Sequence, residues 1–338
     1  MKKILSVFLA VLLVASLFTL AGCGAKELKF GLGVSAKYGK STSADGETNG
    51  NTEVTATVAA VLVDESGKIV KCVIDEALNK ANYTSEGKAV ANESFKTKGE
   101  QGADYGMAAY GTDLNKDGVV KEWNEQIAAF VSNVEGKTID EVKAMVVDGY
   151  GNDDIQTAGC TMAVAPYVTA LEKAVANAKE SKATADDTLN LGIVSSEEVA
   201  DATEDKAGSV ELNASATAAV LDKDGKVVVA ATDVVSTTVS FDTKGVTDVD
   251  TTKALSTKAE LGENYGMAAH GTDLNGDGVV KEWNEQGAAF DAALVGKTAD
   301  EIAGLEKDGY GTEAVQTAGC TIAISDMVKA AVKAATVK

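Results

Sequence analysis

The chain contains no arginine, one histidine, one proline and four cysteines. Its formal net charge is −20, and this becomes −22 once Lys2 and Lys3 are left out. A strongly acidic protein without arginine lacks the basic surface patch that binds the phosphate backbone of nucleic acids. We therefore expect no nucleic-acid partner.

An internal repeat organises the rest of the sequence. Residues 105–130 read YGMAAYGTDLNKDGVVKEWNEQIAAF, and residues 265–290 read YGMAAHGTDLNGDGVVKEWNEQGAAF. Each copy leads into the same six residues, Gln-Thr-Ala-Gly-Cys-Thr, which end at Thr161 and at Thr321. The two copies are therefore expected to do the same job.

Several kinds of catalytic site are disfavoured by this repeat. The only histidine, His270, has Tyr110 as its counterpart, so neither a repeated histidine triad nor a zinc site with histidine ligands can be built. Cys160 and Cys320 are equivalent, whereas Cys72 has no counterpart, so no disulfide repeats in both halves. We interpret Cys160 and Cys320 as small buried residues, with a bridge between them as the alternative.

The N-terminus has the pattern of an export signal. Two lysines precede an uncharged apolar run over residues 4–20, and Leu20-Ala21-Gly22-Cys23 has the form of a lipobox. We predict cleavage of residues 1–22 and lipidation of Cys23, which would place the protein on the extracellular face of the cell membrane. An uncleaved anchor helix is the alternative.

The mature chain is predicted to form two homologous α+β domains. Residues 23–28 form a lipid-anchored tether, 29–179 the first domain, 180–188 a linker without apolar periodicity, and 189–338 the second domain. Residues 52–63 and 210–221 alternate in hydrophobicity, and each is followed by an Asp/Gly turn and a second apolar run. Each domain should thus contain an antiparallel hairpin.

Helices are expected after each hairpin. Residues 120–134 place apolar side chains at helical spacing, and capping boxes at Thr138 and Thr298 open a further helix in each copy. Short strands are expected at 162–165 and 322–324, before final helices that begin near Pro166 and at a Ser325 cap. Hairpins followed by helices in one unit indicate an antiparallel sheet packed with helices.

Two glycine motifs are rejected as nucleotide sites. Residues 31–36 have the spacing of a dinucleotide fingerprint, but no amphipathic helix follows them, and the second copy has Asn190 in place of Gly31. Residues 136–138 resemble the end of a phosphate loop, but Val131 occupies the place of its first glycine.

An acidic loop in each copy is a candidate calcium site. Oxygen ligands stand at loop positions one, three and five, with glycine at six, as in EF-hand loops. The candidate ligands are Asp113, Asn115, Asp117, Asp273, Asn275 and Asp277. Position twelve is Asn124 or Asn284 instead of glutamate, so the site should be weak. The alternative is an Asx-rich turn that caps the tryptophan-bearing helix.

The repeated threonine is the main candidate for chemistry. Ala158, Gly159 and Cys160 are small, so an outside enzyme could approach the backbone closely and esterify the Thr161 hydroxyl. The alternative is that the segment is only a tight buried turn.

Taken together, the lipobox, the doubled unit, Tyr-Gly-Met, Gly-x-x-Lys-Glu-Trp and the small-residue threonine motif resemble the FMN-binding-domain lipoproteins of extracellular electron transfer. In that family a flavin transferase uses FAD to link FMN, through its phosphate, to the last threonine of an Asp-x-x-Ser/Thr-Gly-Ala-Thr motif. The resemblance implies two covalent FMN groups, on Thr161 and Thr321. The chain departs from the motif by having Ala-Gly-Cys-Thr, and its upstream acid is Asp154 in one copy and Glu313, one place further away, in the other.

The same resemblance implies an electron-transfer flavoprotein, not a substrate-specific enzyme. Its partners would be a membrane quinone-linked donor and extracellular acceptors such as ferric species. The candidates for lining the flavin rings are Tyr105, Met107, Trp123, Tyr265, Met267 and Trp283. Ordinary core packing is the alternative for these six. A non-redox, calcium-stabilised binding lipoprotein of the cell surface is the alternative function.

Overall fold

The computed structural model describes residues 26–116, 118–274, 276 and 278–336. The predicted signal peptide and residues 23–25 of the predicted tether, which include Cys23, therefore lie outside the described residues. Within the described part, antiparallel sheets pack with helices, which confirms the α+β class. No helix of that part is both long enough and apolar enough to cross a bilayer.

The first sheet is built around a long antiparallel hairpin. Strand β1 (Lys29–Thr42) pairs with β2 (Gly50–Val63), which pairs with β3 (Ile69–Tyr83). The β2–β3 connection is the predicted Asp/Gly turn, in which Asp64 Oδ1 accepts from Ser66 N–H and Lys68 N–H. Two short strands, β4 (Ala89–Val90) and β7 (Lys179–Glu180), pair with β3 and β1.

The second sheet repeats this plan and confirms the second hairpin. Its strands are β8 (Thr188–Ala200), β9 (Gly208–Leu221) and β10 (Val227–Phe241), in the order β10-β9-β8. The corresponding turn is held by Asp222 Oδ1, which accepts from Asp224 N–H and Lys226 N–H.

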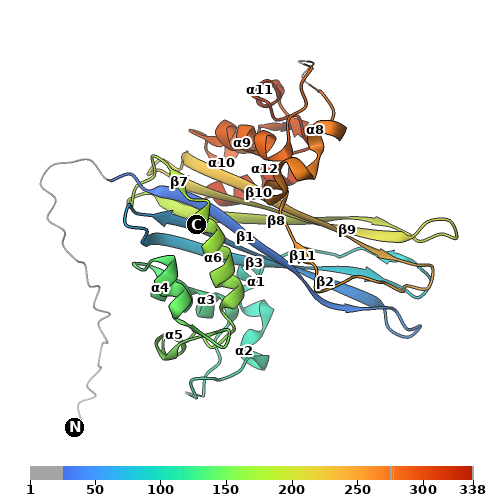
Figure 1. Ribbon diagram of the computed structural model, residues 1–338, viewed down its shortest axis with the longest axis horizontal. Helices are drawn as coiled ribbons and strands as arrows, with labels where there is room; N and C mark the ends of the chain where they lie inside the picture. Colours follow the sequence, from blue (N-terminus) through green and yellow to red (C-terminus); the bar gives the residue numbers. More distant parts are fainter. Residues whose placement is uncertain (1–25, 117, 275, 277, 337–338) are drawn as a thin grey trace, which may run out of the picture.

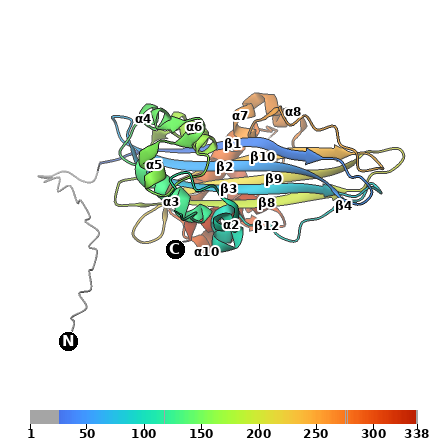
Figure 2. The same ribbon diagram turned by 90° about the horizontal axis from the view of Figure 1, so that it is seen from below.

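The two sheets stack face to face, with one set of helices on each outer side (Figures 1 and 2). Alternation in β2 explains this arrangement, because its two faces join different cores. Val58, Ala60 and Leu62 pack toward the second sheet, whereas Val61 and Val63 pack toward helices. A strand that is buried on both faces has apolar residues at consecutive positions, and residues 58–63 of β2 show this pattern.

Two halves of the chain are interlocked at this interface. Strand β11 (Ala254–Leu255), from the second half, pairs with β1 of the first, and Lys173 Nζ lies 2.5 Å from Glu260 Oε1. The expected linker is also packed, since Ala183 is buried and its carbonyl accepts from Leu28 N–H at 2.7 Å. The division at 180–188 remains a prediction.

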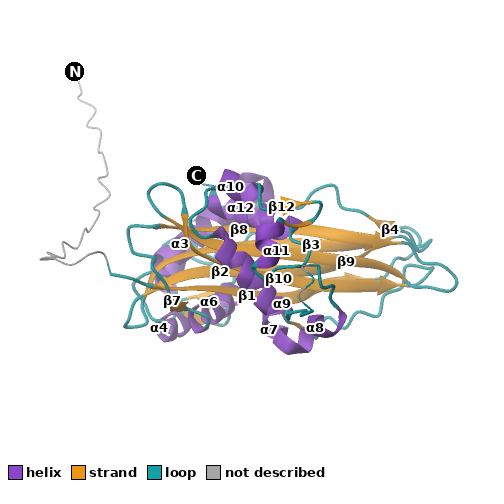
Figure 3. Ribbon diagram, turned by 90° about the horizontal axis from the view of Figure 1, so that it is seen from above, coloured by secondary structure: helices purple, strands orange, loops and turns teal. Residues whose placement is uncertain are grey.

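At one end of the molecule the strands extend past the helices, so the two stacked sheets have no helices on their outer faces there (Figure 3). A small separate core fills that end, where the rings of Tyr83 and Phe241 stack with centroids 4.8 Å apart. One aromatic residue from each half thus forms part of the core that joins the two sheets at this end.

The helices of the first half cover the outer face of the first sheet. They are α1 (Lys98–Gln101), η1 (Gly102–Tyr105), α2 (Met107–Tyr110), α3 (Trp123–Val134), α4 (Ile139–Ala144), α5 (Asp153–Thr157) and α6 (Ala165–Ala176), with β5 (Val146–Val147) and β6 (Tyr150–Gly151) between α4 and α5. Helix α3 begins at Trp123 and not at residue 120, because Glu122 forms the N-cap in a capping box with Glu125.

The second half repeats the same order. Its elements are α7 (Lys258–Leu261), η2 (Gly262–Tyr265), α8 (Met267–His270), α9 (Trp283–Leu294), α10 (Ala299–Ala303), β12 (Glu306–Lys307), β13 (Tyr310–Gly311), α11 (Glu313–Thr317) and α12 (Ser325–Ala335). The capping boxes at Thr138 and Thr298 are confirmed. The Ser325 cap is wrong, because Ile324 is the N-cap and Ser325 is already helical.

The predicted strands at 162–165 and 322–324 are reduced to single bridges. Ala163 pairs only with Tyr150, and Ala323 only with Tyr310. The partner strands β6 and β13 have only two residues each, so the pairing with Ala163 and Ala323 does not continue into a longer strand pair.

Helix α6 lies directly on β1 because two glycines of that strand face it. A Cβ at Gly31 would be 2.0 Å from the Ala174 carbonyl oxygen, and one at Gly33 would be 2.2 Å from that of Ala170. The spacing that superficially matches a dinucleotide fingerprint therefore serves helix–sheet packing.

Candidate functional site

The repeated Thr-Ala-Gly-Cys-Thr segment is the C-terminal cap of a short helix. Helix α5 ends at Thr157, Gly159 has φ of 102°, and Cys160 N–H donates to the Ile155 carbonyl while Gly159 N–H donates to that of Gln156. This is a Schellman cap, in which glycine supplies the left-handed residue. Gly319, with φ of 105°, repeats it at the end of α11.

Both motif threonines are buried directly after this cap. Thr161 is 4% exposed and Thr321 is 8% exposed. The expectation that the turn presents an open hydroxyl is therefore wrong for this conformation. The exposed hydroxyl of the motif belongs instead to Thr157, four residues earlier in the helix.

A buried glutamine holds each threonine in place. Gln126 Oε1 accepts from Thr161 N–H at 2.8 Å, from Met162 N–H at 2.9 Å and from the Thr161 hydroxyl at 3.4 Å. Gln286 repeats this with Thr321, at 2.8 Å to the N–H and 3.0 Å to the hydroxyl. Neither glutamine was predicted, although Trp-Asn-Glu-Gln is identical in both copies.

The same glutamine brings Met107 to the threonine. Gln126 Nε2 lies 3.3 Å from Met107 Sδ and donates to the Lys121 carbonyl at 2.8 Å. Gln286, Met267 and Lys281 repeat these contacts at 3.4 and 2.8 Å. Tyr-Gly-Met, Lys-Glu-Trp and the threonine motif, far apart in sequence, therefore meet at one point in each half.

The tryptophans lie behind this point, inside the cores. Trp123 is 1% exposed, and its Nε1 donates to the Tyr167 hydroxyl at 2.8 Å. Trp283 is 2% exposed in the equivalent core, where Met327 takes the place of Tyr167. Their burial supports the alternative that both are core residues.

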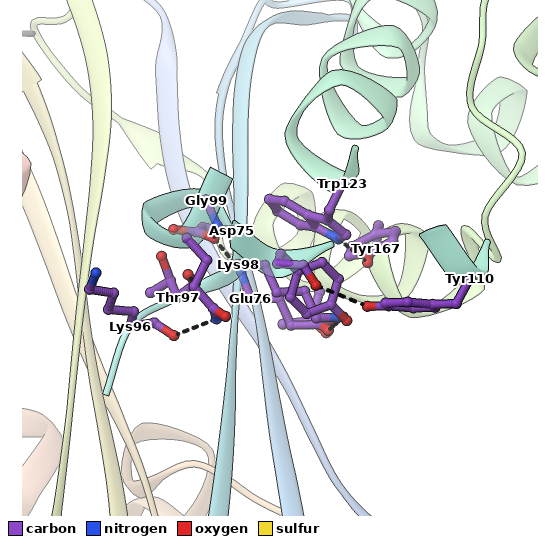
Figure 4. A network of polar contacts seen from close by, with 12 residues as sticks. Asp75, Glu76, Lys96, Thr97, Lys98, Gly99, Tyr110, Trp123 and Tyr167 are labelled. Carbon is purple, nitrogen blue, oxygen red and sulfur yellow. Dashed lines mark hydrogen bonds and ion pairs between the residues drawn. The ribbon is translucent and has the colours of Figure 1, made fainter. Parts of the chain in front are cut away.

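The first half has a buried ion pair beside its aromatic residues (Figure 4). Lys98 contacts Glu76, whose other oxygen accepts from the Thr57 hydroxyl at 2.8 Å. Burial opposes the Lys98 charge, but the pair with Glu76 outweighs it and raises the pKa of Lys98. The ammonium also lies 5.0 Å from the centre of the Tyr105 ring.

The second half keeps the lysine and the tyrosine of this arrangement but not the acid. Lys258 Nζ lies 5.3 Å from the centre of the Tyr265 ring, and Val234 stands at the position of Glu76. The second half has a different buried acid, Asp291, whose counterpart in the repeat of the first half is Val131. Burial raises the pKa of Asp291 to about 7, and its Oδ1 has no hydrogen-bond partner among the described residues.

A lysine lies against each glycine cap. Lys121 Nζ donates to the Ala158 carbonyl at 3.3 Å and lies 2.2 Å from where a Cβ of Gly159 would stand. Lys281 Nζ lies 2.4 Å from the corresponding point at Gly319. The upstream acids Asp154 and Glu313 are exposed in the first turns of α5 and α11.

The cysteines of the motif are buried thiols, as predicted. Cys160 and Cys320 are both free and 0% exposed. Burial raises the pKa of Cys160 to about 12 and that of Cys320 to about 11, so both remain thiols at neutral pH.

The acidic loops are described only in part, since Asp117, Asn275 and Asp277 lie outside the described residues. Asp113 Oδ2 accepts from Gly118 N–H at 3.0 Å, and Asp273 accepts from Gly276 N–H and Gly278 N–H. These hydrogen bonds reach N–H groups three or five residues further along the loop, and the N-caps of the tryptophan-bearing helices are Glu122 and Glu282, so the alternative of a turn that caps those helices is wrong. The described residues contain no group of three or more acidic, histidine or cysteine side chains that could hold a metal.

A hollow of about 690 Å³ lies beside α5, lined by residues that include Asp148, Tyr150 and Gln156. Its volume is in the range of small-molecule sites. It borders the helix that carries the threonine motif, but Thr161 is not among the described residues that line it.

Comparisons with known proteins give one partial likeness. The chain is 32% identical over 135 residues to a protein named chlorophenol reductase from Desulfitobacterium hafniense. The match covers 35% of this chain and 38% of that protein, so the chain spans well under half of its relative. No family model matches the chain, and no solved structure matches it.

Proposed function

We propose that this protein is a lipid-anchored electron carrier with two covalent FMN groups, one on Thr161 and one on Thr321. The observation that carries the proposal is the duplicated threonine turn, which has the same helix cap, the same buried glutamine and the same adjacent methionine in both halves. Two copies of so specific an arrangement favour a shared chemical role over independent packing solutions.

The attachment chemistry would need only the threonine and an outside enzyme. The threonine Oγ forms a bond to the FMN phosphorus of FAD, the phosphoanhydride bond of FAD breaks, AMP leaves and the hydroxyl proton is released. The partner is thus a flavin transferase. The bound flavin supplies the redox chemistry, in single electrons or in pairs, while the protein supplies attachment and electrostatics.

Part of the site fits a phosphoester, and part of it must move. The acceptor has small neighbours, and a lysine lies at the cap. However, Thr161 is only 4% exposed and its hydroxyl donates to Gln126, so the hydroxyl would have to leave the glutamine before modification. Gln126 would still hold the turn through the main-chain N–H groups of Thr161 and Met162.

The wider proposal includes the two tandem FMN-binding-type domains and the lipidated Cys23 on the outer membrane face. Electrons would pass from a membrane quinone-linked donor to extracellular acceptors such as ferric species. The partial likeness to a protein named as a reductase supports a redox role. Covalent attachment also suits a location outside the cell, from which a free cofactor would be lost.

Intact mass provides the test. The mature protein is produced with a flavin transferase, FAD and magnesium, denatured, and examined for flavin fluorescence on a gel. Thr161→Ala and Thr321→Ala should each remove one FMN mass, and the double variant should remove both. Thr157→Ala is the matched control because its exposed hydroxyl lies in the same motif. Loss of FMN with Thr157→Ala alone would contradict the assignment.

The second candidate is a non-redox binding lipoprotein stabilised by calcium. It is favoured by Asp113, whose Oδ1 is buried without a hydrogen-bond partner among the described residues. A bound cation would satisfy that oxygen. Thermal unfolding with calcium and with a chelator tests this function. A large chelator-induced loss, in protein that never acquires flavin, would support it.

A further inference from the structure

We infer that Lys121 and Lys281 are the cationic partners of the phosphate groups that would be attached to Thr161 and Thr321. The inference rests on the proposed function and adds a recognition role for two residues of this chain. The ligand chemistry is that of a phosphodiester carrying one negative charge.

The first argument is position. Lys121 Nζ lies at the glycine cap, within 3.3 Å of the Ala158 carbonyl oxygen, and its own carbonyl accepts from the glutamine that holds Thr161. The Lys121 side chain therefore contacts Ala158 at one end of the four-residue segment 158–161, and its main-chain carbonyl contacts Gln126, which holds Thr161 at the other end. In the second half, Lys281 has the same relation to Gly319 and Gln286.

The second argument is space. A Cβ at Gly159 would lie 2.2 Å from Lys121 Nζ and 2.7 Å from its Cε. A glycine is already favoured here by φ of 102°, and the absence of a side chain also lets the ammonium come close to the backbone of the turn. Because both halves show this close approach, the lysine is part of the repeated turn.

The third argument is charge. Among the described residues, neither Lys121 nor Lys281 forms an ion pair with a carboxylate. The next carboxylates in the chain accept from main-chain groups, since Glu122 accepts from Ala108 N–H and Glu282 accepts from Met267 N–H and Ala268 N–H. The ammonium is thus available to an anion in a protein whose net charge would otherwise repel one.

The test uses one acceptor at a time. In a Thr321→Ala background, Lys121→Gln should slow flavin attachment to Thr161 about tenfold, the size expected for losing one charge-assisted contact. Lys121→Arg should keep the rate within about threefold, because the charge is retained. Lys182→Gln, an exposed lysine in the 180–188 segment, makes the same change in net charge and should have no effect.

A second readout separates recognition from catalysis by the transferase. In protein that has been fully modified by long incubation, the phosphorus-31 resonance should shift in Lys121→Gln and remain in place in Lys182→Gln. Equal rates and equal resonances for these two variants would overturn the inference. So would an Lys121→Arg variant as slow as Lys121→Gln.

The two failures are distinguishable. If unmutated protein acquires no FMN mass, the proposed function itself fails. If it acquires FMN and the lysine variants behave as the control does, only the role of the lysines fails. Lys281→Gln in a Thr161→Ala background repeats the measurement independently in the second half.

Discussion

Gln126 and Thr161 are 35 positions apart in sequence, yet Gln126 Oε1 lies 2.8 Å from the Thr161 main-chain nitrogen in a buried contact. The glutamine satisfies the N–H groups that follow the helix cap, and these groups would otherwise be buried without a partner. The candidate site is therefore anchored by helix α3 and not by the threonine segment alone.

Gln126→Ala should destabilise the fold. Removing the amide leaves the N–H groups of Thr161 and Met162 without an acceptor, which costs about 1–3 kcal/mol for each buried group left unsatisfied. Urea unfolding measures the change. Asn124→Ala, an exposed position on the same helix, should stay within about 0.5 kcal/mol. Equal effects for the two variants would mean that the glutamine does not hold the turn.

Gly159→Ala tests the cap and the lysine together. Alanine at φ of 102° is strained, and its Cβ would meet Lys121 Nζ at 2.2 Å. We expect a loss of about 1–3 kcal/mol in the free energy of unfolding from backbone strain alone. Gly46→Ala is the control, since φ is 92° there and a Cβ would meet nothing within 4 Å. An equal loss at Gly159 and at Gly46 would show that Lys121 moves aside without cost.

The buried ion pair of the first half should be replaceable as a unit. Glu76→Val leaves Lys98 buried without its partner and should cost about 3–5 kcal/mol. Adding Lys98→Met should recover much of that loss, because no buried ammonium is then left without its carboxylate partner. A double-mutant cycle by chemical denaturation measures the coupling. Additive losses would argue against a strong pair.

As a comparison for that cycle, Glu172→Ala removes the partner of Lys143 in an exposed pair. Exposed pairs contribute little, so this variant should leave the unfolding midpoint unchanged.

Stability should fall as the pH rises from about 4 to about 7. Burial raises the pKa of Asp233 to about 6 and that of Asp291 to about 7, so the folded state holds more protons than the unfolded state across this interval. The free energy of unfolding should therefore decrease with pH, by at most about 1.4 kcal/mol per pH unit for each group. Denaturation between pH 4.5 and 7.5 measures it.

Asp291→Asn should flatten that pH dependence, because asparagine remains neutral while its side-chain oxygen still accepts from Thr232 N–H. Asp205→Asn, at an exposed position, should leave the profile unchanged. If Asp291→Asn gives the same slope as the unmutated protein, Asp291 titrates normally.

Local structure was predictable where short-range chemistry decides it. Alternation over 52–63 and 210–221 with Asp/Gly turns identified both hairpins, and the boxes at Thr138 and Thr298 fixed two helix starts. The Ser325 prediction was wrong because it used local sequence alone. Serine is a common N-cap residue, but α12 begins one residue earlier than the pattern suggested, with Ile324 as its N-cap.

The amino-acid sequence by itself determined the duplication, the α+β class, the hairpins and the identity of the repeated threonines, because these depend on neighbours in the chain and on side-chain period. Only the tertiary structure decided that β11 joins the first sheet, that Thr161 is buried against Gln126 and that Lys121 lies at the Gly159 cap. Those contacts join residues tens to hundreds of positions apart, and their geometry follows from how sheets and helices close around shared cores.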